Sequence, residues 1–364
     1  MEKTTEYAVS MRHITKTFGK VVANHDVSLD LREGEILALL GENGSGKTTL
    51  MNMLSGIYYP DHGEILIHGK PASIRSPREA FDLGIGMIHQ HFKLVHNFTV
   101  LENIILGVET TSRGFLKMDK AREKVTALSE RYGLRVNPDA CISDITVGMQ
   151  QRVEILKMLY RENEILIFDE PTAVLTPQEI DELMKIMKEL VSEGKSILFI
   201  THKLNEIKAV ADRCTVLRKG RYIGTVDVAS TTKEEMSEMM VGRKVNLNVE
   251  KTPAQPGEVV LSARGVCVKG HGGSKNVVDH VDFDVRRGEI VCIAGIDGNG
   301  QTELVYALTG LVEPEEGTVT LNGQDITHAP IRRRNAGGLG HIPEDRHRHG
   351  LVLDYNLAYN LVLQ

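Results

Sequence analysis

The stretch of sequence that decides the fold is Gly41-Glu42-Asn43-Gly44-Ser45-Gly46-Lys47-Thr48. It matches the pattern GxxxxGK followed by Ser or Thr, and the apolar run Ile36–Leu40 stands directly before it. We interpret the apolar run as a buried strand and expect a helix to begin at about Lys47. A glycine-rich turn in this position points backbone N–H groups inward, and the positive end of the helix adds to their attraction for phosphate. The stretch therefore predicts a phosphate-binding loop.

Lys47 and Thr48 have specific expected roles in this loop. The Lys47 ammonium group would reach the β- and γ-phosphates of a nucleotide, and the Thr48 hydroxyl would ligate Mg²⁺. The predicted nucleotide ligands from this part of the chain are Gly41, Glu42, Asn43, Gly44, Ser45, Gly46, Lys47, Thr48 and Thr49.

Two further apolar strands, at residues 165–168 and Ser196–Ile200, end in polar side chains. Fully apolar strands that alternate with helices favour an α/β fold with a parallel sheet covered on both faces, where ligands bind at the carboxyl ends of the strands. Asp169 is expected to hold Mg²⁺, and Glu170 to orient and partly deprotonate an attacking water. His202, after the second strand, is in a position to contact the γ-phosphate.

The helix after Glu170 has clear boundary signals. Thr176 is a suitable N-cap, Pro177 suits the first helical position, and Glu179 completes a capping box. Gly194 is expected to end the helix.

The sequence also repeats itself. Motifs recur 254 positions further on, so that Gly41 corresponds to Gly295 and Lys47 to Gln301. A period of this length indicates tandem domains rather than short repeats. Counterparts of Asp169 and His202 would fall near positions 423 and 456, so we expect the second domain to be incomplete and the chain to be C-terminally truncated. The expected boundaries are 1–242 for the first domain, 243–258 for a linker and 259–364 for the second domain.

Composition excludes several classes of protein. The 43 basic and 49 acidic residues give a net charge of −6, which argues against nucleic acid as a partner. The four cysteines are scattered without a CxxC pair, so neither a disulfide framework nor a zinc site is indicated. The polar N-terminus does not resemble a signal peptide, and the longest apolar runs are far shorter than the roughly 20 residues of a membrane-spanning helix.

Two more segments complete a recognisable set. Gln90 lies between the phosphate loop and Asp169, and residues 145–149 precede the strand at 165–168. Together with Lys47, Glu170 and His202, their order and spacing resemble the nucleotide-binding domain of ABC transporters over essentially the whole chain. The resemblance implies a P-loop NTPase fold with a helical subdomain, followed by the N-terminal part of a second copy.

The resemblance also assigns roles to matching positions. Gln90 corresponds to the glutamine that senses Mg²⁺ and faces the membrane subunit, and Phe18 to the aromatic residue that stacks on adenine. Residues 173–176 correspond to the D-loop, and residues 145–149 to the signature LSGGQ, whose expected nucleotide contacts are Thr146 and Gly148. On this basis the catalytic residues are Glu170, His202 and Gln90, and the Mg²⁺ ligands are Thr48, Gln90 and Asp169.

Several positions depart from the family pattern. Only Gly148 of the signature is unchanged, Gln301 replaces the loop lysine in the second copy, and Glu344 stands where the first copy has Gln90. Residues 270–273 offer no aromatic side chain for adenine. In the family, each ATP lies between the phosphate loop of one domain and the signature of the other, so domain 1 would pair with domain 2. We therefore expect one hydrolytic site, built on Lys47 and Glu170, and one site that binds nucleotide but turns it over poorly.

Two fused domains of this kind resemble the ATP subunit of importers for simple sugars and nucleosides, and residues 342–351 resemble the nucleoside branch. Such a subunit would lie at the cytoplasmic face of the membrane, bind ATP with Mg²⁺, serve two transmembrane permease subunits and act indirectly with an extracytoplasmic solute-binding protein. One competing hypothesis is a soluble tandem ABC ATPase that acts on ribosomes, although such proteins usually keep both loop lysines. Another is a P-loop small-molecule kinase, which would not need Gln90, the signature and His202.

Two weaker patterns stay open at this point. Phe92, Leu94 and Val95 fit either a groove for a permease helix or the local core. A group of three histidines, His341, His347 and His349, lacks the carboxylate or cysteine neighbours that would support a metal site.

Overall fold

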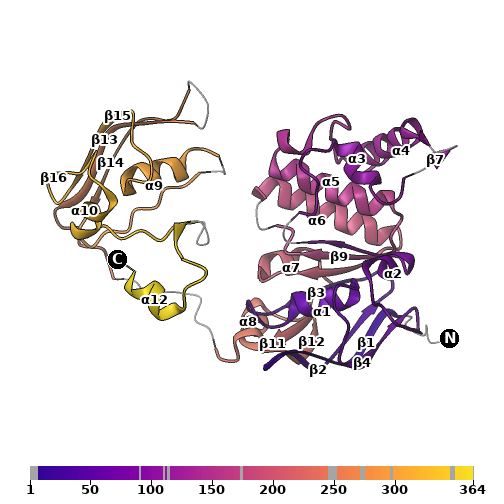
Figure 1. Ribbon diagram of the computed structural model, residues 1–364. Coiled ribbons are helices and arrows are strands. Elements are labelled where there is room, and N and C mark those ends of the chain that lie inside the picture. The colour runs from indigo at the N-terminus through magenta and orange to yellow at the C-terminus, as the bar shows by residue number, and fades with distance from the viewer. Residues whose placement is uncertain are drawn as a thin grey trace. The chain divides into compact units, whose positions relative to one another are not determined.

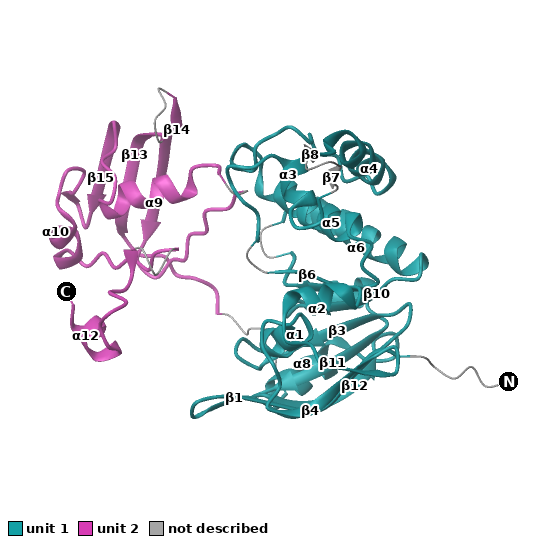
Figure 2. Cartoon of the chain, turned by 45° about the vertical axis from the view of Figure 1, so that its right-hand side comes forward, with its two compact units in different colours: residues 1–247 teal, residues 248–364 magenta. Residues whose placement is uncertain are grey.

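The computed structural model describes residues 7–89, 92–109, 111–112, 115–172, 175–244, 252–270, 275–295, 298–344 and 349–363. The chain divides into two compact units, residues 1–247 and 248–364 (Figure 2). The predicted linker at 243–258 lies partly outside the described residues, and its boundaries stay a prediction. Each unit is described here by itself.

Unit 1 is built around a six-stranded sheet of order β12-β11-β3-β10-β9-β6 (Figure 1). Strands β11, β3, β10, β9 and β6 run parallel, and β12 pairs antiparallel with β11 at one edge. All residues of β3, β9 and β10 are buried, which confirms the covered parallel sheet. The strands are β3 (Ile36–Leu40), β6 (Ile85–Ile88), β9 (Ile165–Asp169), β10 (Ser196–Ile200), β11 (Arg213–Arg218) and β12 (Arg221–Asp227).

A second, antiparallel sheet of order β2-β1-β4-β5 packs over one face of the parallel sheet. Apolar side chains of β1, β2 and β4 meet those of α1 and of the parallel strands in one core. These strands are β1 (Tyr7–Phe18), β2 (Val21–Arg32), β4 (His62–Ile67) and β5 (Lys70–Ala72), and a separate short hairpin is formed by β7 (Thr111–Ser112) and β8 (Phe115–Leu116).

Helices α3, α4, α5 and α6 share a core with the opposite face of the parallel sheet, and Figure 1 shows them gathered on that side. This group contains the predicted helical subdomain. The helices of unit 1 are α1 (Lys47–Leu54), α2 (Pro77–Asp82), α3 (Val100–Ile105), α4 (Met118–Arg131), α5 (Val147–Tyr160), α6 (Pro177–Ser192), α7 (Leu204–Val210) and α8 (Lys233–Val241), with a 3-10 turn at Ile142–Asp144.

Helix α6 begins and ends where the sequence predicted. Thr176 is its N-cap, the reciprocal capping box with Glu179 is formed, and Pro177 is the first helical residue. The helix ends at Ser192, and Gly194 follows with a φ of 92°, a left-handed conformation that favours glycine.

Unit 2 repeats the element order of the first part of unit 1. Its sheet has the order β14-β13-β15-β16, and helix α9 occupies the position of α1 in the sequence of elements. The elements are β13 (Val259–Lys269), β14 (Asn276–Arg286), β15 (Glu316–Leu321), β16 (Gln324–Asp325), α9 (Gln301–Thr309), α10 (Ile331–Ala336) and α12 (Leu357–Val362).

The repeat is not uniform along the chain. Thr17 pairs with Val22 across the first hairpin of unit 1, and Lys269 pairs with Asn276 across the same hairpin of unit 2. The turn in unit 2 is therefore two residues longer. Strand β13 corresponds to β1 with an offset of 252, whereas the offset of 254 predicted from the sequence holds from β14 onward.

Residues 290–294 are the counterpart of β3 and have no strand conformation. In unit 1, β3 is held between β10 and β11. The apolar side chain of Ile290 is 88% exposed.

Among the residues that the structure describes, we found no helix that combines the length and the hydropathy needed to cross a membrane.

Candidate functional site

The phosphate loop lies between β3 and α1, as predicted. Gly46 is the N-cap of α1 with a φ of 92°, and a Cβ atom at this position would lie 2.5 Å from the carbonyl oxygen of Ala23. Gly41 likewise has no room for a Cβ beside the Ser45 hydroxyl and the carbonyl oxygen of Leu217. Close backbone approach therefore requires glycine at both ends of the loop.

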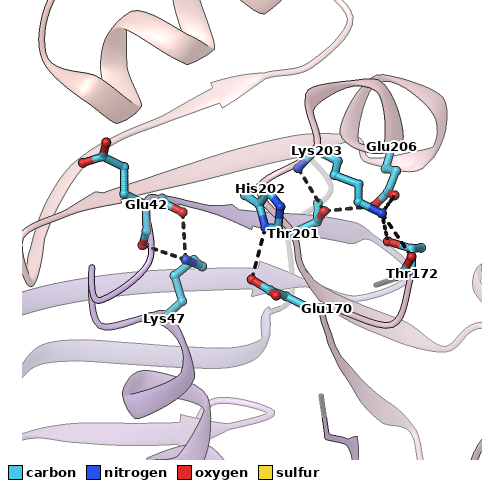
Figure 3. A network of polar contacts seen from close by, with 9 residues as sticks. Glu42, Lys47, Glu170, Thr172, Thr201, His202, Lys203 and Glu206 are labelled. Carbon is cyan, nitrogen blue, oxygen red and sulfur yellow. Dashed lines mark hydrogen bonds and ion pairs between the residues drawn. The ribbon is translucent and has the colours of Figure 1, made fainter. Parts of the chain in front are cut away.

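The Lys47 side chain lies within its own loop. Its Nζ donates hydrogen bonds to the carbonyl oxygens of Gly41, at 2.7 Å, and Glu42, at 2.9 Å (Figure 3). Burial lowers the pKa of the Lys47 ammonium group, and the nearby carboxylates of Glu170 and Asp169 partly oppose this effect. The ammonium group is thus held over the loop, where phosphate oxygens would replace the two carbonyl oxygens.

A cavity of about 390 Å³ lies above this loop. It joins the loop and the start of α1 to the beginning of β2 and to the end of β9. The residues that line it are Val21, Val22, Ala23, Asn43, Gly44, Gly46, Lys47, Thr48, Thr49 and Glu170. Six of the predicted nucleotide ligands are therefore brought together, while Gly41, Glu42 and Ser45 shape the loop behind them.

Phe18 does not line this cavity. Its ring is 42% exposed at the end of β1, with Lys16 Nζ 5.6 Å from the ring centroid and the Tyr58 ring edge-on at 5.1 Å. Phe18 pairs across the turn of the same hairpin with Val21, which does line the cavity. Its stacking on adenine stays a prediction.

Asp169 is the last residue of β9 and is 2% exposed. Burial raises the pKa of its carboxyl group to about 6, the adjacent Glu170 carboxylate adds to this, and the Thr48 side chain and Lys47 oppose it. Its Oδ1 is buried and has no hydrogen-bond partner. An orphaned, desolvated carboxylate oxygen beside the Thr48 hydroxyl fits a hard cation such as Mg²⁺, which prefers oxygen ligands.

Glu170 follows with an unusual backbone conformation. Its φ of 47° is rare for a residue with a side chain, and its N–H donates to the carbonyl oxygen of Ile200 at 3.0 Å. This geometry turns the carboxylate toward His202, whose Nδ1 lies 3.3 Å from Glu170 Oε1 (Figure 3). The predicted pair at the ends of β9 and β10 is therefore in contact, and Glu170 also lines the cavity.

Comparison with known proteins identifies this arrangement. A family model described as "ABC transporter" matches residues 24–173 and 278–354. The chain belongs to the ABC transporter family. The two matched segments lie one in each unit of this ABC ATPase.

Individual relatives are similar over nearly the whole chain. The chain is 56% identical to the nucleoside import ATP-binding protein NupA of Lactococcus lactis and 55% identical to the guanosine import ATP-binding protein NupO of Bacillus subtilis. Both matches cover 99% of this chain, and 71% and 70% of the relatives. The glucose import ATP-binding protein TsgD13 of Haloferax volcanii is 42% identical over the same shares of 99% and 70%.

The fold has solved counterparts. The ADP conformation of MJ1267, an ATP-binding cassette of an ABC transporter, matches 65% of this chain and 96% of its own, with a TM-score of 0.57 and 25% identity. The family and the fold confirm the predicted ABC-type ATPase.

The signature residues of this ABC ATPase lie at the start of α5, away from the cavity over the phosphate loop. Thr146 is the N-cap of α5, and its hydroxyl accepts a hydrogen bond from the Met149 N–H at 3.3 Å. Gly148 lies against the Glu179 carboxylate, which would have to shift to make room for a Cβ at this position. Nucleotide binding by Thr146 and Gly148 stays a prediction. Gln90 and residues 173–174 lie outside the described residues.

Sequence reasoning missed a buried network beside Glu170 and His202. Lys203 Nζ donates to the carbonyl oxygen of Thr172 at 3.0 Å and to its hydroxyl at 3.1 Å, and lies 3.2 Å from Glu206 Oε1 (Figure 3). The Thr201 hydroxyl accepts from the Lys203 N–H at 3.1 Å and donates to Glu206 Oε2 at 2.9 Å. The segment after β9 is thereby tied to the segment after β10. The spacing Thr201-His202-Lys203-x-x-Glu206 was the available signal.

The corresponding loop of unit 2 has different side chains. Gln301 occupies the position of Lys47 and lies close against Gly295. The Thr302 hydroxyl, the counterpart of Thr48, donates to Glu344 Oε2 at 3.1 Å. Relative to unit 1, this loop has lost a positive charge and gained a negative one.

The structure also describes parts of the apolar segment 92–95 and of the group of three histidines. Leu94 is 8% exposed and belongs to the core on the helical side of the sheet, and Phe92 packs against that core. Both observations favour the local-core interpretation. His341 and His349 lie edge-on to the Tyr306 ring, at 6.4 and 5.5 Å between centroids, and His347 lies outside the described residues.

Proposed function

We propose that this chain is the ATP-hydrolysing subunit that energises nucleoside uptake through an ABC importer, with a hydrolytic site in unit 1 and a degenerate site in unit 2. The observation that carries the solute class is the identity of 55–56% to subunits named for nucleoside and guanosine import, against 42% to one named for glucose import. The solute itself would contact the permeases rather than this subunit, so the structure supports the energising step alone.

In unit 1, we propose a residue for each step of ATP hydrolysis. The Lys47 ammonium group would bind the β- and γ-phosphates from above the loop, and the N–H groups of Gly44 and Gly46 would bind them from below. Thr48 and Asp169 would hold Mg²⁺, which when bound neutralises phosphate charge. Glu170 would orient the attacking water and accept its proton, while His202, in contact with Glu170, would reach the γ-phosphate.

In unit 2, the same position is poorly suited to hydrolysis. A neutral amide at Gln301 cannot offset phosphate charge, and the Glu344 carboxylate would repel it. The two changes act in the same direction on the same ligand. We therefore propose that this site binds nucleotide without turning it over efficiently, and that pairing of the two domains places it against Thr146 and Gly148.

Contact with the permeases is proposed at the cytoplasmic face of the membrane. Unit 1 has a cavity of about 210 Å³ between α2, the end of β6 and α5, lined by Phe81, Met87, His89, Lys157 and Met158 among others. His89, one of its lining residues, directly precedes in sequence Gln90, the residue that the family resemblance assigns to the membrane subunit. Its lining combines apolar side chains with both basic and acidic ones, Glu154 among them.

The test is reconstitution of the full-length protein with its two permeases and solute-binding protein in vesicles. We expect ATP-dependent uptake of guanosine, loss of both hydrolysis and uptake in Glu170→Gln, and less than a twofold change in Gln301→Ala. Steady ATP hydrolysis by Glu170→Gln would overturn the site assignment. Uptake of glucose or ribose in place of guanosine would move the proposal to sugars, while copurification with ribosomes or phosphoryl transfer to a nucleoside would replace it.

A further inference from the structure

Three neighbouring strands of unit 2 bring a cysteine, a histidine and a glutamate to one place. Cys267 on β13 is in register with Glu316 on β15, and His280 lies beside it on β14, where Val281 pairs with Val266. Neighbouring strands are about 4.8 Å apart, so three residues in a lateral row can direct their side chains to one point. The residues are 13 and 36 positions apart in sequence, which is why no spacing motif revealed them.

The side chains do converge. One ligand atom from each of Cys267, His280 and Glu316 lies within 4.8 Å of the other two. His280 Nε2 and Glu316 Oε2 are 3.8 Å apart, although they come from strands on opposite sides of β13. They therefore reach across the central strand above the Cys267 thiol, which is itself completely buried. Thiolate, imidazole and carboxylate are the three ligand types of zinc sites in proteins.

Hydrogen bonds from neighbouring groups hold the His280 ring and the Cys267 sulfur, as such bonds hold the ligands of metal sites. His280 Nδ1 lies 2.9 Å from Asp279 Oδ1, and such a hydrogen bond fixes the ring and leaves Nε2 free to coordinate. The His280 backbone N–H donates to Cys267 Sγ at 3.2 Å, which stabilises negative charge on the sulfur. Both contacts are present without any metal ion, so the ligands are already oriented.

Unit 1 allows a comparison within the same chain. Thr15, Asp26 and His62 stand at the positions that correspond to Cys267, His280 and Glu316, and Thr15 is in register with His62. The Asp26 N–H donates to the Thr15 hydroxyl at 3.0 Å, as His280 donates to Cys267, and the φ values of Asp26 and His280 are 51° and 49°. The backbone therefore needs an acceptor at this position, but it does not need a thiol. Unit 1 also has one carboxylate and one imidazole here, on the opposite strands, so the thiol is what unit 2 adds.

We propose that Cys267, His280 and Glu316 bind one divalent cation of the zinc class. Binding forms bonds from the metal to Cys267 Sγ, to an imidazole nitrogen of His280 and to Glu316 oxygen, with water in the remaining position. The thiol proton is released to solvent as the thiolate coordinates. The cation would link β13, β14 and β15 to one another.

The experiment is a titration of the full chain, kept reduced, with Co²⁺ as a spectroscopic probe and Zn²⁺ as competitor. We expect one Co²⁺ per chain with a thiolate-to-cobalt charge-transfer band, which Zn²⁺ abolishes. Cys267→Thr installs the residue of unit 1 and keeps the backbone acceptor, so it should fold while losing the band and binding Zn²⁺ at least tenfold more weakly. Cys292→Ser, which removes an exposed cysteine outside the cluster, is the matched control and should keep the band.

A second variant tests the proposal independently, in case the first variant does not fold. His280→Asn removes the imidazole, and asparagine tolerates the left-handed conformation at this position. It should also weaken Zn²⁺ binding at least tenfold. Absence of a charge-transfer band in the wild-type chain, or a band unchanged in both variants, would overturn the proposal, as would loss of the band in Cys292→Ser.

Discussion

The two phosphate loops of this chain share glycine conformations and differ in the side chain that follows the last glycine. Gly46 and Gly300 both precede the helix with φ values of 92° and 90°, and each would place a Cβ 2.5 Å from a carbonyl oxygen of the neighbouring strand. The residue after this glycine is Lys47 in unit 1 and Gln301 in unit 2. The strand beside each loop differs too, because the buried Asn24 of unit 1 is replaced by Val278 in unit 2.

This difference separates what the fold requires from what the chemistry requires. The glycines are present in both units because no other residue fits the backbone, whatever the loop binds. Lysine and asparagine are present only in unit 1, where we propose that ATP is hydrolysed, and both carry a cost in stability, since each places polar atoms in a buried environment. Exchanging residues between the two units therefore tests which contacts serve the nucleotide.

The largest expected effect comes from giving unit 1 the residue of unit 2. Lys47→Gln removes a charge contact worth roughly 4 kcal/mol at about 4 Å and an effective dielectric of 20, or on the order of a thousandfold in rate. ATP hydrolysis by the assembled transporter is the measurement. The reverse exchange, Gln301→Lys, should change the rate less than twofold, and a new, rapid hydrolytic activity there would contradict the comparison.

Asp169→Asn should raise the stability of the nucleotide-free chain while abolishing hydrolysis. The folded pKa of Asp169 is about 6, above its ordinary value of 3.8, so the folded state binds more protons between these pH values. The free energy of unfolding therefore falls as pH rises through this window, by about 3 kcal/mol at most. Asparagine does not titrate, so the variant should match the wild type near pH 4 and exceed it at pH 7.5. Urea unfolding at both pH values measures this, and a gain independent of pH would speak against the assignment.

Lys203 is expected to act as a positioning residue for Glu170 and His202. Lys203→Met should lower the rate of ATP hydrolysis about tenfold without changing the KM for ATP, because the lost hydrogen bonds hold the segment after Glu170 and touch no nucleotide. Lys203→Arg should recover much of the rate. A matched control is Lys208→Met, since Lys208 donates to the carbonyl oxygen of Val228 away from the site. Equal losses in both methionine variants would indicate general destabilisation.

The smallest expected effect is that of Asn24→Val, which gives unit 1 the side chain that Val278 provides in unit 2. Asn24 Nδ2 donates to the Gly46 carbonyl oxygen at 3.2 Å, but its Oδ1 is buried without a partner. The Gly46 oxygen would still accept from the Leu50 N–H at 3.0 Å, so valine leaves no polar atom unsatisfied there. We expect a gain of about 1 kcal/mol in unfolding free energy and severalfold weaker ATP binding. A loss of stability would show that Asn24 serves the fold.

The parts predicted from sequence are those that local residues determine. The phosphate loop and the capped helix that begins after Thr176 are each marked by residues that stand close together in the chain. Motif spacing also placed Glu170 and His202 at neighbouring strand ends, because parallel strands align their carboxyl ends.

The parts that sequence did not predict depend on distant contacts. Residues 290–294 repeat a strand motif, but a strand forms only against other strands. The contact of Gly148 with Glu179, 31 residues away, was likewise not predicted, while its nucleotide contact stays a prediction. Lys203 is half-exposed and follows the expected histidine, so it resembled an ordinary surface lysine until its contacts with Thr172 and Glu206 were visible.

The two hydrogen bonds from Lys47 to the carbonyl oxygens of Gly41 and Glu42 also set a condition for entry to the nucleotide site. A ligand displaces them only by offering the ammonium group a stronger acceptor, and an anionic phosphate oxygen is one. A nucleoside without phosphates offers none, so it gains nothing from the loop. If the solute is a nucleoside, as we propose, it would gain nothing from this loop when it competes with ATP.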